Sequence, residues 1–250
     1  IRDIEEIKGV EKKDSGDIYI GAGTVFSHIT ADPVIQECIP VLGEAVDQVG
    51  GPQIRNIGTI GGNICNGAVS ADSVPTVFSY NALLKIANAG GGRTVPVREF
   101  YLGPGCVDLH PGEVLTHVII PRAEYEGYHG HYIKYSMRNA MDIATLSCSV
   151  VSRIDSAKNI LEDVRITFGV AAPIPYRCVE TEELLKGQKP GEELYQKLED
   201  SIRKEIHPRD SWRASRDFRL QISGEIARRA LIQTVKLAGV PAKDQGGEEA

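Results

Sequence analysis

The sequence predicts an α+β protein, and two observations in its second half carry that prediction. Three long segments rich in β-branched and apolar residues come first, over Tyr132 to Met137, Ala144 to Ile154 and Leu161 to Val170. Three helical patterns then follow, over Glu180 to Lys186, Gly191 to Ile206 and Asp217 to Ala238. Strands followed by helices, instead of alternating with them, are typical of an antiparallel sheet with helices beside it. We therefore expect a three-stranded antiparallel sheet and helices in this half.

A charged stretch with glycines, from Pro121 to Gly130, is the expected boundary between two domains. It separates the strand and helix run described above from a first half with a different pattern. We expect a first domain over residues 1–125 and a second over residues 126–240. The remaining residues, 241–250, are polar and rich in glycine, and this composition predicts a disordered tail.

The first half is predicted to contain short strands and short helices. Asp17 to Ile20 alternates polar and apolar residues, which indicates a strand. From Phe26 to Gly50 apolar residues recur at helical spacing, with Pro33 and Pro40 suited to first turns, so we expect two helices there. A glycine-rich stretch, Gly50 to Asp72, follows them.

Three further elements complete the first half. Asp72 to Tyr80 reads as a short helix with Ser70 or Asp72 available as its cap. Leu83 to Ala87 and Arg93 to Val97 flank three consecutive glycines and predict a hairpin. Glu113 to Pro121 predicts a strand that the proline ends.

Composition excludes several classes of function. The chain has 250 residues, a net charge of −6 and 42% hydrophobic residues, so it is an ordinary globular chain, and nucleic acid is not an expected partner. No apolar run approaches the roughly 20 residues that span a bilayer, and no basic segment followed by an apolar core opens the chain. We expect a cytoplasmic protein with no membrane partner.

Cysteines and histidines do not indicate a metal site. The chain has five cysteines, Cys38, Cys65, Cys106, Cys148 and Cys178. They are far apart and odd in number, which fits reduced thiols better than disulfides. No C-x-x-C pair occurs among them. His129 and His131 share one face if they lie in a strand, which makes them a weak candidate pair for a metal. Solvated surface imidazoles are the favoured interpretation, because the third ligand of a usual site is missing.

The glycine-rich stretch is the strongest candidate for a binding site. Five glycines between Gly50 and Gly62 allow positive φ and close backbone approach. The run from Gly58 to Asn63 offers consecutive backbone N–H groups, a hydroxyl and a carboxamide, the donors that a phosphate-binding nest needs. No Lys-Ser or Lys-Thr follows, so this is no Walker A loop, and the G-x-G-x-x-G spacing is absent. A glycine-rich turn with no ligand is the alternative interpretation.

Several motifs together resemble one family. The run from Arg55 to Asn63, with Ser70-Ala71-Asp72 after it, resembles the FAD-binding signature of the flavoprotein subunit of molybdenum hydroxylases, such as xanthine dehydrogenase and the carbon monoxide dehydrogenase medium chain. Three later runs are similar to the separate FAD subunit of bacterial xanthine dehydrogenases: Lys134 to Ile143, Phe168 to Pro173, and Ser211 to Ser215 with Phe218-Arg219. The resemblance covers about Ile1 to Gly239.

This resemblance implies a fold, a cofactor and partners. The fold would be a PCMH-type FAD-binding domain followed by a second α+β domain. FAD would take electrons that reach it from a molybdopterin-binding large subunit through the [2Fe-2S] clusters of a small subunit, and would pass them to NAD⁺. In the family a segment with a first pyrophosphate loop precedes the position of Ile1, so we expect that this lobe is missing or lies on another chain.

The resemblance also implies roles for individual residues, and it implies no catalytic side chain. The residues that would contact the FAD pyrophosphate are Thr59, Ile60, Gly61, Gly62 and Asn63. Ser70 would also bind the cofactor, and Asp72 would bind the ribose or ribityl hydroxyls. Leu115 would lie near the cofactor, and Lys134 would reach the isoalloxazine. Val49 stands where some relatives place an aromatic ring. Arg138 and Asp142, in the turn after Lys134, are candidates for the NAD⁺ site, although a surface ion pair between them is the alternative.

Two other functions stay open at this point. The chain could be a non-catalytic scaffold whose flavin site is incomplete, since loss of one phosphate loop removes charge-assisted hydrogen bonds worth about 1.5 to 3 kcal/mol each. It could also be an aryl-alcohol or sugar oxidase of a related flavin fold, which the absence of a substrate-cap region disfavours. The substrate of the whole enzyme is not determined by this chain.

Overall fold

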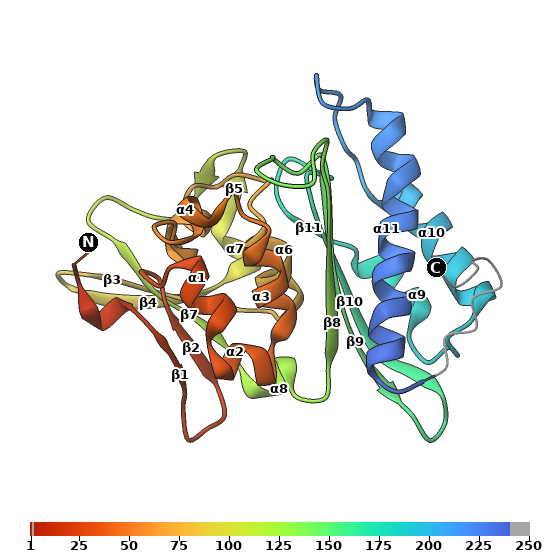
Figure 1. The fold of residues 1–250 in the computed structure, drawn as a ribbon, viewed down its shortest axis with the longest axis horizontal. Helices are drawn as coiled ribbons and strands as arrows, with labels where there is room; N and C mark the ends of the chain where they lie inside the picture. The colour runs from red at the N-terminus through yellow and green to blue at the C-terminus, as the bar shows by residue number, and fades with distance from the viewer. Residues whose placement is uncertain (2, 241–250) are drawn as a thin grey trace.

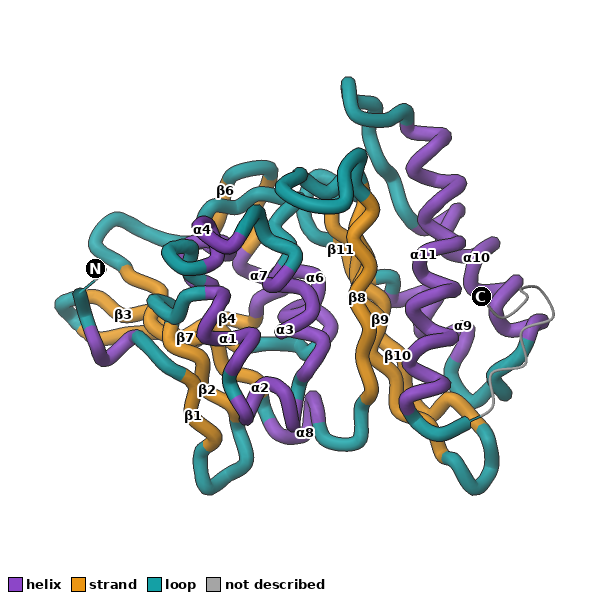
Figure 2. The backbone as a smooth tube through the Cα atoms, viewed as in Figure 1, coloured by secondary structure: helices purple, strands orange, loops and turns teal. Residues whose placement is uncertain are grey.

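The computed structural model describes residue 1 and residues 3–240, and it consists of four layers (Figure 1). One sheet is followed by a layer of short helices, then by a second sheet, and then by a layer of longer helices. Figure 2 shows the same order, with strands on both sides of the first helical layer. Two hydrophobic cores fill the described part, one on each side of the second sheet. No helix among the described residues is long and apolar enough to cross a bilayer.

The first sheet has five antiparallel strands in the order β1-β2-β7-β3-β4. Their bounds are β1 Val10–Lys12, β2 Ile18–Gly21, β3 Leu83–Asn88, β4 Gly91–Pro96 and β7 Val114–Ile120. Val118 lies opposite Ile20 on one side and Leu84 on the other, and all three side chains are buried. A 3-10 helix, Glu5–Ile7, precedes this sheet, and a small ribbon of β5 Tyr101–Gly103 and β6 Cys106–Val107 lies beside it. The expected hairpin is confirmed as β3 and β4.

Short helices cover this sheet. They are α1 Phe26–Ala31, α2 Pro33–Cys38, α3 Pro40–Asp47, α4 Pro52–Arg55, α5 Ile60–Cys65, α6 Ser73–Ser79, α7 Val97–Phe100 and α8 Arg122–Tyr125. The prediction of two helices between Phe26 and Gly50 is wrong, because three occur there. Pro33 and Pro40 each begin a new helix, and a proline disfavours helical backbone in the residue before it, so Asp32 and Ile39 interrupt the run. Asp32 caps α2 by accepting from the Val34 N–H at 2.9 Å.

The second sheet has four antiparallel strands in the order β11-β10-β9-β8, not the three expected. Their bounds are β8 His129–Tyr135, β9 Leu146–Asp155, β10 Ile160–Gly169 and β11 Tyr176–Arg177. The additional strand is only two residues long, too short for a sequence pattern, and its register against β10 pairs Arg177 with Thr167. Three helices cover the outer face of the sheet: α9 Val179–Leu185, α10 Glu192–Glu205 and α11 Arg216–Leu237. The α+β class and the antiparallel second sheet are confirmed.

The expected domain division at residues 125 and 126 stays a prediction. Tyr128 and Tyr132, which follow that boundary, pack into the core of the first half. The tail over residues 241–250, expected to be disordered, lies outside the described residues.

Helix α6 lies between the two sheets, and all seven of its residues are buried. Ser79 at its end donates to the Pro75 carbonyl at 3.0 Å, and its hydroxyl shares a hydrogen bond of 2.9 Å with the Thr167 hydroxyl of β10. Arg165, also in β10, donates to the Ser79 carbonyl at 3.2 Å and forms ion pairs with Glu124 at 2.8 Å and Asp163 at 3.2 Å. Buried polar groups need such partners, so this polar contact fixes the second sheet against the first half.

We predict that Arg165→Ala lowers the free energy of unfolding by about 3 kcal/mol, because it leaves two carboxylates without their shared, largely buried cation. Urea unfolding followed by circular dichroism measures the loss. The control is Arg229→Ala, which removes an exposed pair between neighbouring helical turns with Glu225 and should cost under about 0.5 kcal/mol. Equal losses in the two variants would contradict this role of Arg165.

Candidate functional site

The glycine-rich stretch folds into two short helices that meet the first sheet. Helix α4 is followed by a single bridge between Thr59 and Val25, and then by α5. Thr59 caps α5, since its Oγ1 accepts from the Gly62 N–H at 3.1 Å. The hydroxyl proton of Thr59 stays available to donate to a ligand.

The backbone N–H groups of this loop already have acceptors within the chain. Ile60 N donates to the Thr24 carbonyl at 3.1 Å, Gly61 N to the Ala22 carbonyl at 2.8 Å, and Asn63 N to the Thr59 carbonyl at 3.0 Å. These N–H groups are engaged within the chain, and the expected phosphate contacts of the run from Gly58 to Asn63 stay a prediction. A phosphate contact at the N–H of Ile60, Gly61 or Asn63 would have to replace one of these bonds, whereas the Thr59 hydroxyl can donate without breaking any of them.

Two of the glycines have different roles. A Cβ at Gly61 would lie 2.6 Å from the Ala22 Cβ and 2.7 Å from the Ala22 carbonyl oxygen, so Gly61 permits the close packing of α5 on the strand end. A Cβ at Gly62 would meet only Thr59 Oγ1, at 3.1 Å. Gly61 therefore serves the fold, whereas Gly62 keeps its surroundings open.

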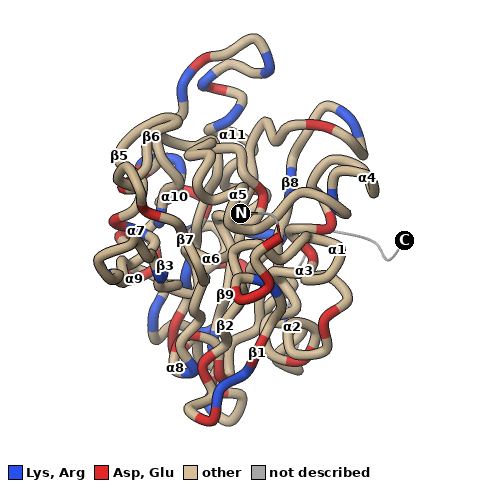
Figure 3. Tube along the Cα trace, turned by 90° about the vertical axis from the view of Figure 1, so that its left-hand side faces the viewer, with Lys and Arg blue, Asp and Glu red and all other residues tan. Residues whose placement is uncertain are grey.

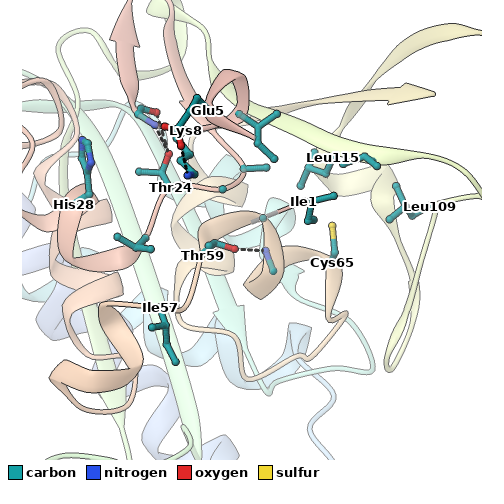
Figure 4. Close-up of a pocket in the computed structure, with 18 of the residues that line it drawn as sticks. Ile1, Glu5, Lys8, Thr24, His28, Ile57, Thr59, Cys65, Leu109 and Leu115 are labelled. Carbon is teal, nitrogen blue, oxygen red and sulfur yellow. Dashed lines mark hydrogen bonds and ion pairs between the residues drawn. The ribbon is translucent and has the colours of Figure 1, made fainter. Parts of the chain in front are cut away.

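The larger cavity has a volume of about 880 Å³ and lies between α5, the sheet and the first residues of the chain (Figure 4). Of the predicted residues, Thr59, Gly61, Gly62 and Leu115 line it. Figure 4 shows Cys65, Leu109 and Leu115 on one side, and Thr24 and Thr59 on another. Ile60 is fully buried in the core, so its side chain does not reach this cavity. The volume and the mixture of apolar wall and hydroxyl groups are typical of a site for a large organic ligand.

A second cavity, of about 420 Å³, lies on the other side of α5 and is shared by both halves of the protein. Its lining includes predicted residues from the first half, namely Asn63, Ser70 and Asp72, and the loop residues Met141, Asp142 and Ile143 from the second. Val49 lines it as well. Because Gly62 faces one cavity and Asn63 the other, the predicted cofactor residues divide between two neighbouring spaces.

A buried ion pair joins the two halves beside this second cavity. Lys134 Nζ lies 2.8 Å from Asp72 Oδ2, and the two side chains are 6% and 7% exposed. Tyr132 donates to Asp72 Oδ1 at 2.8 Å, and Lys134 also donates to the Gln48 carbonyl at 2.8 Å. Burial raises the pKa of Asp72, while the Lys134 charge and the hydrogen bonds from Lys134 and Tyr132 oppose that rise.

The interpretation of Asp72 as a helix cap is wrong. Asp72 precedes α6, but its side chain accepts no N–H of that helix. Asn63 takes that place, since its Oδ1 accepts from Ser73 N at 3.4 Å and Ser73 Oγ at 2.7 Å. Tyr132 and Gln48 were not among the predicted site residues. One signal was available for Tyr132, because residues two apart in a strand share a face, and Lys134 was already a candidate.

The turn with Arg138 and Asp142 is closed by its own hydrogen bonds. Arg138 N donates to Asp142 Oδ2 at 3.0 Å, and the Arg138 side chain donates to the Met141 carbonyl at 2.8 Å. The hydrogen bonds from the Ile143 and Arg138 N–H groups hold the pKa of Asp142 below its usual value. The expected ion pair is a longer contact, 3.6 Å, and the Arg138 side chain is 69% exposed. The structure therefore leaves most of the guanidinium accessible to a ligand.

Two predicted histidines lie apart from this site. His129 and His131 both fall in β8, and His131 Nδ1 lies 3.2 Å from Glu44 Oε2. Within residues 1 and 3–240, no group of three His, Cys, Asp or Glu side chains is placed to hold a metal ion.

These features define a protein that holds a large organic cofactor between two α+β halves. They are the two sheets, the glycine-rich loop and the cavities on both sides of α5. Comparison with known proteins identifies the cofactor. Residues 1–123 match the family described as the FAD binding domain in molybdopterin dehydrogenase, and residues 131–234 match the CO dehydrogenase flavoprotein C-terminal domain.

Individual relatives agree with these matches. The putative xanthine dehydrogenase FAD-binding subunit of Escherichia coli K12 is 37% identical over 239 residues, which cover 96% of this chain and 81% of the relative. The carbon monoxide dehydrogenase medium chain of Hydrogenophaga pseudoflava is 31% identical over 231 residues, 92% of this chain and 79% of the relative. The solved carbon monoxide dehydrogenase from the same organism superposes with a TM-score of 0.88 at 29% identity, over 95% of this chain and 81% of that chain.

The chain belongs to the family of xanthine dehydrogenase FAD-binding subunits and carbon monoxide dehydrogenase medium chains. It is an FAD-binding subunit of a molybdenum hydroxylase-type oxidoreductase. The residues present fit that cofactor, since the open face at Gly62, the Thr59 hydroxyl and the apolar wall at Leu115 supply space, a donor and a surface for a ring.

We predict that Gly62→Val abolishes FAD binding with little loss of fold, because its side chain enters the space over the capping hydroxyl of Thr59. The matched change Gly61→Val should unfold the apoprotein at a lower temperature, because its side chain collides with Ala22. Flavin absorbance after desalting and thermal unfolding of the apoproteins separate the two effects. Stoichiometric flavin in the Gly62→Val protein would contradict the assignment.

We also predict that Asp72→Ala weakens FAD binding more than Asp72→Asn, because the amide oxygen can still accept a hydrogen bond. In the apoprotein Asp72→Ala should cost about 3–5 kcal/mol, since it leaves the Lys134 charge buried without a partner. The double variant Asp72→Ala/Lys134→Met should be more stable than Asp72→Ala alone. Additive losses in urea unfolding would show that the pair is not coupled.

Proposed function

We propose that this subunit takes electrons from the [2Fe-2S] clusters of a small subunit and passes them to NAD⁺, in an assembly whose large subunit binds molybdopterin. The observation that carries the proposal is the second cavity. Its lining combines predicted FAD-binding residues of the first half, such as Asn63 and Asp72, with the second-half loop that also contains the exposed Arg138. The substrate of the assembly would be oxidised on the large subunit. We place the assembly in the cytoplasm, which agrees with five cysteines that are all free.

Specific residues would hold FAD in this proposal. The segment assigned to the pyrophosphate consists of Thr59, Ile60, Gly61, Gly62 and Asn63. The rest of FAD would be contacted by Ser70, Asp72, Leu115 and Lys134. The hydroxyl of Thr59 would donate to a phosphate oxygen. Asp72 would accept from a ribityl or ribose hydroxyl through a lone pair of its carboxylate that Lys134 and Tyr132 do not use. Ile60 contributes through its backbone only.

When bound, FAD supplies the exchange between one-electron carriers and a two-electron acceptor. The protein supplies charge and position. Lys134 presents a cation at the junction of the two halves, and Asp72 and Gln48 fix its Nζ. The turn from Met137 to Asp142 stands at the same junction, where an acceptor with a pyrophosphate could be held by Arg138 through two parallel hydrogen bonds.

We predict that Arg138→Ala raises the KM for NAD⁺ by about tenfold in the assembled enzyme, because a charge-assisted contact worth roughly 1.5 kcal/mol is lost. Flavin reduction by the enzyme's substrate should keep its rate, since those electrons arrive before NAD⁺ takes part. Steady-state kinetics and rapid mixing measure the two quantities.

The control is Lys158→Ala, a change at an exposed lysine in the turn between β9 and β10, at the opposite end of the strands. It should leave both quantities unchanged. An unchanged KM for NAD⁺ in Arg138→Ala, or a slower flavin reduction, would show that this loop does not hold the acceptor.

A further inference from the structure

The hydroxyl of Tyr132 is a buried polar group that packing alone does not require. Tyr132 is 2% exposed, and its ring packs into the core of the first half although it lies in β8 of the second half. A phenylalanine ring would fill that core equally well, since only the hydroxyl needs a polar partner. The hydroxyl donates to Asp72 Oδ1 at 2.8 Å. The role of this group therefore has to be sought at Asp72.

The carboxylate of Asp72 has one donor on each oxygen, and both donors come from the same strand. Tyr132 and Lys134 are two residues apart in β8, so their side chains lie on one face. Tyr132 donates to Oδ1, and Lys134 donates to Oδ2 at 2.8 Å. Donors on different oxygens fix the rotation of the carboxylate. Because each oxygen can accept more than one hydrogen bond and Asp72 lines the second cavity, a ligand there meets an acceptor of fixed orientation.

The two donors also act on the ionisation of Asp72. Burial raises the pKa of Asp72, and the charge of Lys134 together with the hydrogen bonds from Lys134 and Tyr132 opposes that rise. Burial and the charge of Asp72 raise the pKa of Tyr132 well above its usual value, so Tyr132 keeps its proton and remains a donor. The thiols of Cys65 in α5 and Cys148 in β9 are neutral, because burial raises the pKa of each. Removal of the Tyr132 hydroxyl would therefore raise the pKa of Asp72 further.

Other charged groups on the elements around Asp72 are engaged elsewhere. Figure 3 shows acidic and basic residues interspersed along the trace. Glu44 of α3 lies 3.2 Å from His131, and Asp142 accepts from N–H groups of its own turn. Arg165 donates to the carbonyl at the other end of α6. Within the described part of the chain, the hydrogen bonds to the Asp72 carboxylate thus come from the two side chains of β8.

We propose that Tyr132 is a positioning residue of the FAD site, which holds the Asp72 carboxylate ionised and turned so that one lone pair accepts from a ribose or ribityl hydroxyl. This inference rests on the proposed contact between Asp72 and FAD. Tyr132 acts on the cofactor through Asp72, because its own side chain is buried in the first core. Since β8 belongs to the second half, Asp72 has this orientation only when the two halves are packed together.

The pH dependence of FAD affinity tests this role. A neutral Asp72 accepts more weakly than a carboxylate, so the Kd for FAD should rise as the pH falls through the pKa of Asp72. Tyr132→Phe should raise the Kd about tenfold at neutral pH and move its acid rise to higher pH by about one unit. Quenching of FAD fluorescence on titration with the full-chain apoprotein measures the Kd at each pH. Circular dichroism defines the pH range over which each variant stays folded.

Tyr128→Phe is the matched control. Tyr128 is also a buried tyrosine, and its hydroxyl donates to the carboxylate of Asp163 beside Arg165. The control removes the same kind of bond at a carboxylate that lines neither cavity, so the Kd for FAD and its pH dependence should not change. A wild-type Kd and pH profile in Tyr132→Phe would overturn the proposal. Equal changes in the two variants, or a Tyr132→Phe protein that no longer folds, would show that the hydroxyl serves the fold and would overturn it as well.

Asp72→Asn separates this inference from the proposed function, because an amide does not ionise. This variant should lose the acid rise of the Kd, and the addition of Tyr132→Phe to it should change the Kd by less than about threefold, since the two groups act as one unit. If Asp72→Asn kept the wild-type pH profile, the proposed contact between Asp72 and FAD would fail. If Asp72→Asn lost the acid rise while Tyr132→Phe kept the wild-type profile, only the role of Tyr132 would be wrong.

Discussion

The buried ion pair between Asp72 and Lys134 is the interaction on which the geometry of the site depends. Each charge would be costly to bury alone, and each comes from a different half of the protein. Their pairing, with Tyr132 and Gln48 as further partners, therefore sets the position of β8 against the start of α6. The second cavity owes its place to this contact, because its lining comes from the segments on both sides of the pair.

A second constraint is the burial of α6 between two sheets. A helix with every residue buried has no solvent to satisfy its polar side chains, so Ser73 and Ser79 find partners in Asn63 and Thr167. Small side chains also let the helix fit between the layers. The consequence for function is that Asn63, predicted as a phosphate ligand, already holds the start of this helix through its side-chain oxygen.

The family relationship explains why the two halves have to be held together at the site. An FAD-binding subunit has to hold a long cofactor in one position, because the protein supplies the placement and the charges around a cofactor that carries the redox chemistry. In this chain Arg219 of α11 donates to the Thr145 carbonyl at 3.0 Å, at the end of the loop that contains the exposed Arg138 turn. This contact ties the loop that lines the second cavity to the longest helix of the second half.

The sequence by itself predicted the class, the order of the long strands and helices in the second half, the family and its cofactor, because periodicity, glycine spacing and motif order are local properties of the chain. It also predicted Asp72 and Lys134 separately. Only the tertiary structure decided that these two residues pair, that Asp72 is no helix cap, and that the N–H groups from Ile60 to Asn63 are engaged. It also added a fourth strand of two residues. These features depend on contacts between residues far apart in the chain, and no local pattern records which distant acceptor or counter-charge a group will meet.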